Sequence, residues 1–136
     1  WCFHAAMDVL AAWKPRPLPM QVHCGFGDAD VDLLRADPCL LRGSIEAWPS
    51  VPLVLLHAAY PFSRQAGFLA SVYPNVHVDY GLAVPMLSTA GMCAAVRELL
   101  HLAPLSKCMF STDGYAFPER FFTAARHGRR VLADVL

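Results

Sequence analysis

Three side chains that can bind a metal ion or move a proton stand at corresponding points of three apolar segments. His23 and His57 each end one of these segments, and Asp113 follows a third. Neutral imidazole together with carboxylate is the usual ligand set of a divalent cation that activates water. Zinc suits such a set best, with manganese or iron as alternatives. Each histidine taken alone is more typical of a core residue, so the prediction depends on their equivalent positions.

The segments that carry these side chains indicate an alternating α/β chain. Apolar, β-favouring residues predict strands at Met20–His23, Val51–His57, Val76–Asp79 and Lys107–Ser111. Helical spacing and proline positions predict helices over Cys2–Trp13, Leu40–Trp48, Pro61–Tyr73, Ser88–Leu102 and Pro118–Leu136. Strand–helix alternation requires a parallel sheet with right-handed crossovers, so all four carboxyl ends meet at one edge.

Two polar residues of the predicted strand Val76–Asp79 are weaker candidates for the site. Asp79 ends that segment, and we favour a role in hydrogen-bonding a neighbouring loop over a role as metal ligand. His77 lies inside the segment and is predicted to be structural. Gly25 and Gly27 follow His23 and predict a sharp turn immediately after the first strand.

Composition excludes several classes of protein. The chain has 136 residues, 56% of them apolar, and a formal net charge of zero, so it offers no electrostatic surface for nucleic acid. No apolar run is long enough to cross a membrane. The five cysteines are odd in number and lack CxxC spacing, which favours reduced thiols in a cytoplasmic compartment over disulfides.

Four phrases of the sequence are similar to one known family. They are Pro-Met-Gln-Val-His-Cys-Gly-Phe-Gly-Asp at 19–28, Val-Leu-Leu-His-Ala-Ala-Tyr-Pro-Phe at 54–62, Tyr-Pro-Asn-Val-His-Val-Asp-Tyr at 73–80, and Phe-Ser-Thr-Asp-Gly at 110–114. Together they resemble the amidohydrolase-related metal-dependent hydrolases of the "amidohydrolase 2" type. The nearest branch is the fluffy-G/nodulin-6-like one, in which such a domain is fused to a glutamine-synthetase-like domain.

The resemblance implies the fold and the role of each site residue. It implies a TIM barrel in which residues 1–136 form a partial domain, the parallel (βα)4 carboxyl-terminal half. His23 and His57 would be the metal ligands of the fifth and sixth strands. Asp113 would be the eighth-strand aspartate, a ligand or the catalytic proton acceptor. Tyr60 and Arg64 would contact a small-molecule substrate.

The departures from the family predict that this chain depends on a partner. A full barrel has eight strands and about 250 residues, and the first-strand His-x-His pair has no counterpart here. We therefore expect a fragment, or a subunit that needs a partner half. The strands near Met20 and Phe110 would be apolar sheet edges prone to self-association.

The function that follows is an enzyme activity if the barrel is completed. We expect hydrolysis of a C–N, amide-like bond by metal-activated water. The alternatives are a metal-dependent decarboxylase of the same fold, and a non-catalytic remnant or partner-dependent half-barrel.

Overall fold

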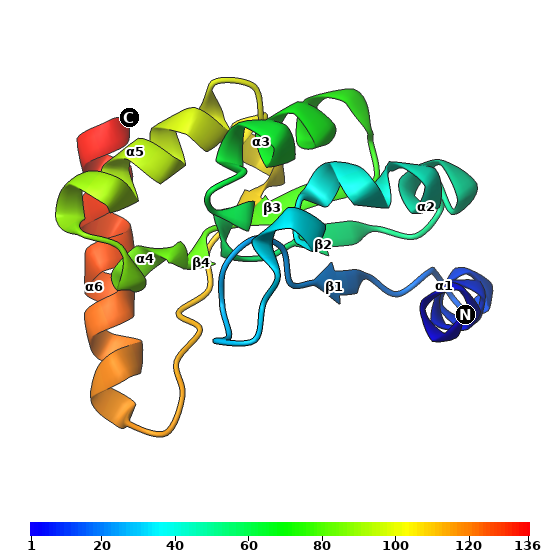
Figure 1. Cartoon of the computed structure of the whole chain (residues 1–136), viewed down its shortest axis with the longest axis horizontal. Coiled ribbons are helices and arrows are strands. Elements are labelled where there is room, and N and C mark those ends of the chain that lie inside the picture. The colour runs from blue at the N-terminus through cyan, green and yellow to red at the C-terminus, as the bar shows by residue number, and fades with distance from the viewer.

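The computed structural model describes residues 1–136, and its centre is a sheet of four parallel strands. These are β1 (Met20–Val22), β2 (Leu53–Leu55), β3 (Val76–Asp79) and β5 (Cys108–Met109), which lie in the order β1-β2-β3-β5 (Figure 1). Each strand therefore lies beside the next one along the chain, and all three pairings are parallel. The parallel sheet predicted from the strand–helix alternation is confirmed.

Helices connect the strands close to the predicted positions. The longer ones are α1 (Cys2–Ala12), α2 (Arg42–Ala47), α3 (Ser63–Val72), α5 (Thr89–Leu100) and α6 (Pro118–Val135). The shorter elements are β4 (Gly81–Leu82), α4 (Ala83–Met86), η1 (Leu33–Arg35), η2 (Pro38–Leu41), η3 (His57–Ala59) and η4 (Leu105–Lys107). Ser88 caps α5, because its Oγ accepts a hydrogen bond from the backbone N–H of Gly91 at 3.1 Å.

Three strands are shorter than predicted: β1 ends one residue early, at Val22, and the ends of β2 and β5 differ by more and matter for the site. β2 ends at Leu55, because the backbone at His57 has already turned into a left-handed conformation. β5 ends at Met109, so Asp113 lies in the following loop and not at the strand end. β5 pairs only with β3, and only over two residues. The residues after Met109 therefore have no neighbouring strand with which to continue the hydrogen bonding.

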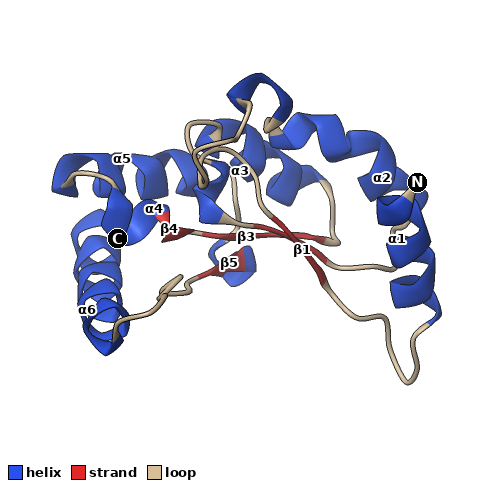
Figure 2. Ribbon diagram, turned by 60° about the horizontal axis from the view of Figure 1, so that its bottom comes forward, coloured by secondary structure: helices blue, strands red, loops and turns tan.

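The two faces of the sheet differ in what covers them. Side chains alternate along a strand, and one face carries Leu53, Leu55, Val76 and Val78, all 0% exposed. Helices α2, α3 and α5 lie together on this side of the strands (Figure 2). This face forms the core of the molecule.

The opposite face is open. Gln21, Val54 and His77 stand side by side in the register of β1, β2 and β3, and all three line a cleft. Val54, on the central strand β2, is nevertheless only 7% exposed. β1 and β5 each have only one neighbouring strand, as predicted for the edges of a partial barrel. None of the helices combines the length and the apolar character that crossing a bilayer requires.

Candidate functional site

The two predicted histidines meet at the carboxyl edge of the sheet. His57 Nε2 and His23 Nδ1 lie 2.8 Å apart, and the two rings meet edge to face with centroids separated by 4.7 Å. His23 directly follows β1 and His57 lies two residues after β2, so the adjacent parallel strands set this contact. Two nitrogens that converge in this way are the donors that a borderline divalent cation prefers.

The turn that carries His57 has an unusual backbone. His57, Ala58 and Ala59 have φ values of 66°, 52° and 47°, in the left-handed region that non-glycine residues rarely adopt. Each such residue costs on the order of 1–3 kcal/mol, and strain of this kind persists only where surrounding contacts enforce it. Here the enforcing contacts are bonds such as Tyr60 N–H to His57 C=O at 3.0 Å. Left-handed residues concentrate at functional sites.

The loop after His23 is fastened to the turn after His57. Gly25 adopts φ +70°, as the predicted turn requires, and a methyl group there would overlap the carbonyls of Ala59 and Tyr60. The Phe26 N–H donates to the Tyr60 carbonyl at 2.7 Å, and the two aromatic rings stack edge to face. The backbones of the two loops are therefore in direct contact, which holds the imidazoles in register.

Burial keeps the His57 imidazole neutral. Its side chain is 2% exposed. Desolvation, followed by the neighbouring His23, lowers the pKa of His57, while the charge of Asp113, the backbone of Gly81 and the charge of Asp79 act in the opposite direction. A neutral imidazole has a lone pair free to bind a metal. His57 Nδ1 is buried and forms no hydrogen bond.

Asp79 is a buried carboxylate that ties three segments together, as the preferred interpretation of the sequence predicted. It is 3% exposed, and its Oδ2 accepts hydrogen bonds from the Ser111 hydroxyl at 2.8 Å and from the Gly81 N–H at 3.0 Å. Desolvation raises the pKa of Asp79, and these two hydrogen bonds oppose the rise. Asp79 thus connects β3 to the loop that follows β5.

Asp113 shares a cleft with His57 but does not complete a metal site. The cleft has a volume of about 870 Å³, and its lining includes His57, His77, Asp79 and Asp113. No group of three or more His, Cys, Asp or Glu side chains is arranged to hold a metal ion. The structure therefore brings His23 and His57 together, while Asp113 lines the same cleft as His57 without joining the pair in a group of three. A divalent cation fits the two nitrogens chemically, while the third donor is not in place.

The two predicted substrate contacts lie elsewhere. Arg64 pairs with Glu98 at 2.9 Å, on the helical layer between α3 and α5, and does not line the cleft. Tyr60 uses its ring and carbonyl to hold Phe26. The structure thus gives Tyr60 a packing role and Arg64 a surface ion pair, and does not bring either to the cleft.

The sequence reasoning missed two cleft residues. His77 lies two residues before Asp79 in β3 and therefore faces the same side of the sheet. It lines the cleft beside Asp79, where we had assigned it a structural role. Ser111, the hydroxyl donor to Asp79, lies two residues before Asp113. The two-residue spacing from a predicted site residue was the signal that would have found both.

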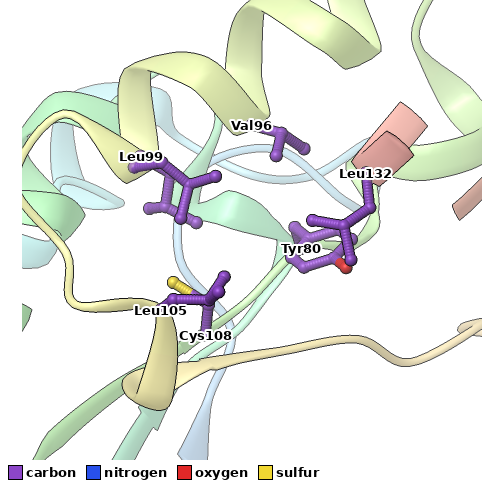
Figure 3. Close-up of a pocket in the computed structure, with 7 residues that line it drawn as sticks. Tyr80, Val96, Leu99, Leu105, Cys108 and Leu132 are labelled. Carbon is purple, nitrogen blue, oxygen red and sulfur yellow. The ribbon is translucent and has the colours of Figure 1, made fainter. Parts of the chain in front are cut away.

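A smaller cavity lies on the other side of the sheet and carries no such chemistry. It has a volume of about 190 Å³ and is lined by apolar side chains of α5, α6 and β5 together with Tyr80 (Figure 3). Among the side chains drawn in Figure 3, only the Tyr80 hydroxyl and the Cys108 sulfur interrupt its hydrocarbon wall. We therefore take the larger cleft, which runs along the open face of the sheet to His57 and Asp113 at its carboxyl edge, as the candidate site.

A family model and two known proteins are similar to this chain in sequence. A family model described as amidohydrolase matches residues 3–134. The protein fluG of Emericella nidulans is 42% identical over 137 residues, which cover 99% of this chain and 16% of fluG. The crystal structure of a protein from Lactobacillus casei, described as a metal-dependent hydrolase, superposes with a TM-score of 0.86 at 34% identity. That match covers 98% of this chain and 34% of the solved one.

Fold and site together define an incomplete parallel α/β barrel with its polar residues at the carboxyl ends of the strands. The chain belongs to the amidohydrolase family, and within it is similar to fluG. It spans about a third of the solved hydrolase and about a sixth of fluG.

Proposed function

We propose that this chain forms part of the catalytic site of a metal-dependent hydrolase that cleaves C–N, amide-like bonds in a small molecule. The contact between His57 Nε2 and His23 Nδ1 carries the proposal. It places two nitrogen donors where the strands of α/β barrels end, which is where such enzymes hold their catalytic groups. The solved relative is described as a metal-dependent hydrolase, which supports a divalent metal here.

In this proposal His23 and His57 bind the cation, and zinc is the ion that two neutral imidazoles favour. A divalent cation at that point acts as a Lewis acid and makes water a stronger nucleophile at neutral pH. Asp113 serves as third ligand or accepts the proton of the attacking water, and its place on the cleft wall supports either role. Burial of His57 supports its part, because a neutral imidazole needs no proton removed before it binds the cation.

The proposed site is completed by residues outside this chain. With two convergent donors and no group of three, the chain alone lacks the ligands that enclose a catalytic ion. The share of each relative that it covers leaves room for the remaining strands, and in fluG for further domains, which we propose include a glutamine-synthetase-like one. Its five free cysteines support a reducing, cytoplasmic setting.

Metal titration tests the proposal. Calorimetry of the purified chain with Zn²⁺ or Co²⁺ is expected to show one site, and His23→Ala or His57→Ala is expected to weaken it by at least about 100-fold. The loss should exceed that caused by removing a group that only supports a ligand. His101→Ala is the matched control, because this imidazole is exposed at the end of α5. Equal binding by all four proteins, or no binding by the unsubstituted chain, would contradict the proposal.

A further inference from the structure

The cavity of about 190 Å³ between α5 and α6 lies apart from the cleft, on the other side of the sheet. Val96 and Leu99 line it from α5, and Leu132 lines it from α6. Helix η4, strand β5 and the residue after β3 supply much of the remaining wall (Figure 3). Val96 and Leu99 are 1% and 0% exposed, so the cavity borders the packed core.

The Tyr80 hydroxyl is the hydrogen-bonding group of this cavity that has no partner in the chain. Tyr80 is 6% exposed, and its ring packs against Phe110 with centroids 5.3 Å apart. Burial, followed by Cys108 and Asp79, raises the pKa of Tyr80, so the hydroxyl keeps its proton and can donate it. The Cys108 thiol, by contrast, already donates to the Pro104 carbonyl at 3.5 Å.

A buried tyrosine hydroxyl normally has a hydrogen-bond partner. The unpartnered Tyr80 hydroxyl therefore indicates where a bound molecule would place an acceptor atom. This distinguishes the cavity from a simple gap in packing, whose wall would present hydrocarbon alone.

The volume and the wall determine what the occupant can be. An apolar protein cavity of roughly 150 Å³ takes up benzene, so a cavity of about 190 Å³ admits one such ring with roughly one or two further heavy atoms. A charged occupant is excluded, because no lining side chain could compensate for the loss of its hydration.

We propose that this cavity binds a neutral, mainly hydrocarbon molecule of that size, and that the Tyr80 hydroxyl donates a hydrogen bond to its one polar atom. Such binding does not depend on the metal site proposed above, because the two sites lie on opposite faces of the sheet and share no lining residue.

Benzonitrile and ethynylbenzene are the probes that test this binding. The two molecules have nearly the same shape, but only the nitrile nitrogen is a good acceptor for the Tyr80 hydroxyl. Titrations followed by ¹H–¹³C NMR spectra of the Val96 and Leu132 methyl groups are expected to show both molecules bound. Benzonitrile should bind more tightly by about 2- to 12-fold, the net value of one hydrogen bond.

Tyr80→Phe should abolish this preference and retain the binding of ethynylbenzene, because the ring stays and only the hydroxyl is lost. Tyr115→Phe is the matched control, since Tyr115 is 76% exposed and lies outside the cavity. Equal affinity of the unsubstituted chain for the two probes, or a benzonitrile preference that survives in Tyr80→Phe, would overturn the proposal.

Val96→Ile locates the bound probes. Its additional methylene group takes up space in the cavity and should weaken the binding of both molecules by about fivefold or more, because ring and side chain then compete for the same volume. Val72→Ile is the matched control, since Val72 is 52% exposed and does not line the cavity. Unchanged binding to Val96→Ile, or no response of the cavity methyl groups to either probe, would overturn the proposal.

Discussion

Gly25 is the residue at which the two histidine loops come closest. Its backbone meets the carbonyls of Ala59 and Tyr60 with no space for a side chain, and the next residue, Phe26, donates to the Tyr60 carbonyl. The imidazoles of His23 and His57 approach to 2.8 Å in loops whose backbones are in direct contact at this glycine. The glycine two residues after a candidate ligand is thus required for the contact between the two loops that carry the ligands.

Replacing Gly25 with alanine should destabilise the chain by roughly 2 kcal/mol or more. The new methyl group meets backbone that cannot rotate away, and φ +70° is itself unfavourable for alanine. Chemical denaturation measures the change in the free energy of unfolding. Gly43→Ala is the matched control: it lies in helix α2 with open space around it, and should raise stability by about 0.5–1 kcal/mol. Equal effects of the two substitutions would show that the loop contact is absent in solution.

Cys24 lies next to His23 in sequence but does not act in the cleft. Its side chain is 3% exposed, and burial, with a smaller contribution from Asp37, raises the pKa of its thiol to about 12. At pH 8 the reactive thiolate is then roughly one part in ten thousand.

We expect a thiol-specific alkylating reagent at pH 8 to label exposed Cys2 quickly and to label Cys24 only as the chain unfolds. Peptide mass spectrometry at successive times distinguishes the two sites. Raising the pH toward 12 should increase the labelling of Cys24, because its thiolate fraction rises in that range. Labelling of Cys24 at the rate of Cys2 would mean that the β1 loop opens readily.

At the scale of elements, helices α5 and α6 do not fully fill the space above the sheet. The cavity of about 190 Å³ between them is bordered by Val96, Leu99 and Leu132, and buried Val96 is 1% exposed. An empty volume of this kind deprives the atoms around it of packing contacts. It also identifies a position at which a larger side chain has room.

Val96→Ile should raise the free energy of unfolding by up to about 0.8 kcal/mol, the value of one buried methylene. Val78→Ile is the matched control, because Val78 is 0% exposed and faces the packed core without lining a cavity. The same added group there should lower stability by about 1–3 kcal/mol through overpacking. Thermal unfolding of the two variants compares them, and a loss of stability in Val96→Ile would show that the cavity closes in solution.

The elements were predicted well where local signals and tertiary packing agree. β3 was predicted at its observed bounds, because Val76 and Val78 alternate with polar residues and the next residues turn. α5 was predicted from the Ser88 cap and the helical spacing that follows. The end of β5 was misjudged, since pairing with a single neighbour stops the strand where the ladder stops, and periodicity carries no information about neighbours.

The site residues, like the elements, were predicted correctly only where local sequence patterns determine their positions. His23 and His57 were found because each follows a strand, and parallel strands bring their ends together. The position of Asp113 relative to the two histidines could not be predicted. Asp113 lies in the loop after the edge strand β5, and the path of that loop is set by contacts such as the hydrogen bond from Ser111 to Asp79. The roles of Arg64 and Tyr60 depend on long-range partners, Glu98 and Phe26, that no local pattern indicates.

On the scale of the whole molecule, the sheet is open at both edges and on one face. The outer edges of β1 and β5 present unpaired backbone groups. The open face of the sheet also exposes apolar side chains such as Met109, which is 39% exposed. Exposed parallel edges of this kind pair with other chains unless charge or cover prevents it. In a complete barrel the other strands cover such edges, and a second copy of this chain would offer an edge of the same kind.

We therefore expect the isolated chain to self-associate, with a sedimentation coefficient that rises with concentration. Met109→Lys should shift the distribution toward the monomer, because a charge on an edge strand opposes pairing. Met86→Lys is the matched control, since Met86 is 58% exposed but lies in α4, away from the sheet edge. A single monomeric species at every concentration would exclude association through the sheet.

The uneven fastening of the loops determines which parts of the cleft are free to diversify. The first two loops share a backbone hydrogen bond, from the Phe26 N–H to the Tyr60 carbonyl. Outside helices and strands, the backbone of residues 110–117 bonds only within its own segment and to the start of α6, where the Arg120 N–H donates to the Phe117 carbonyl. Insertions or substitutions in 112–117 can thus reshape the cleft wall around Asp113 without displacing the imidazoles. As such proteins diverge, new substrate preferences should arise in this third loop, while the loops that begin at His23 and His57 keep their length.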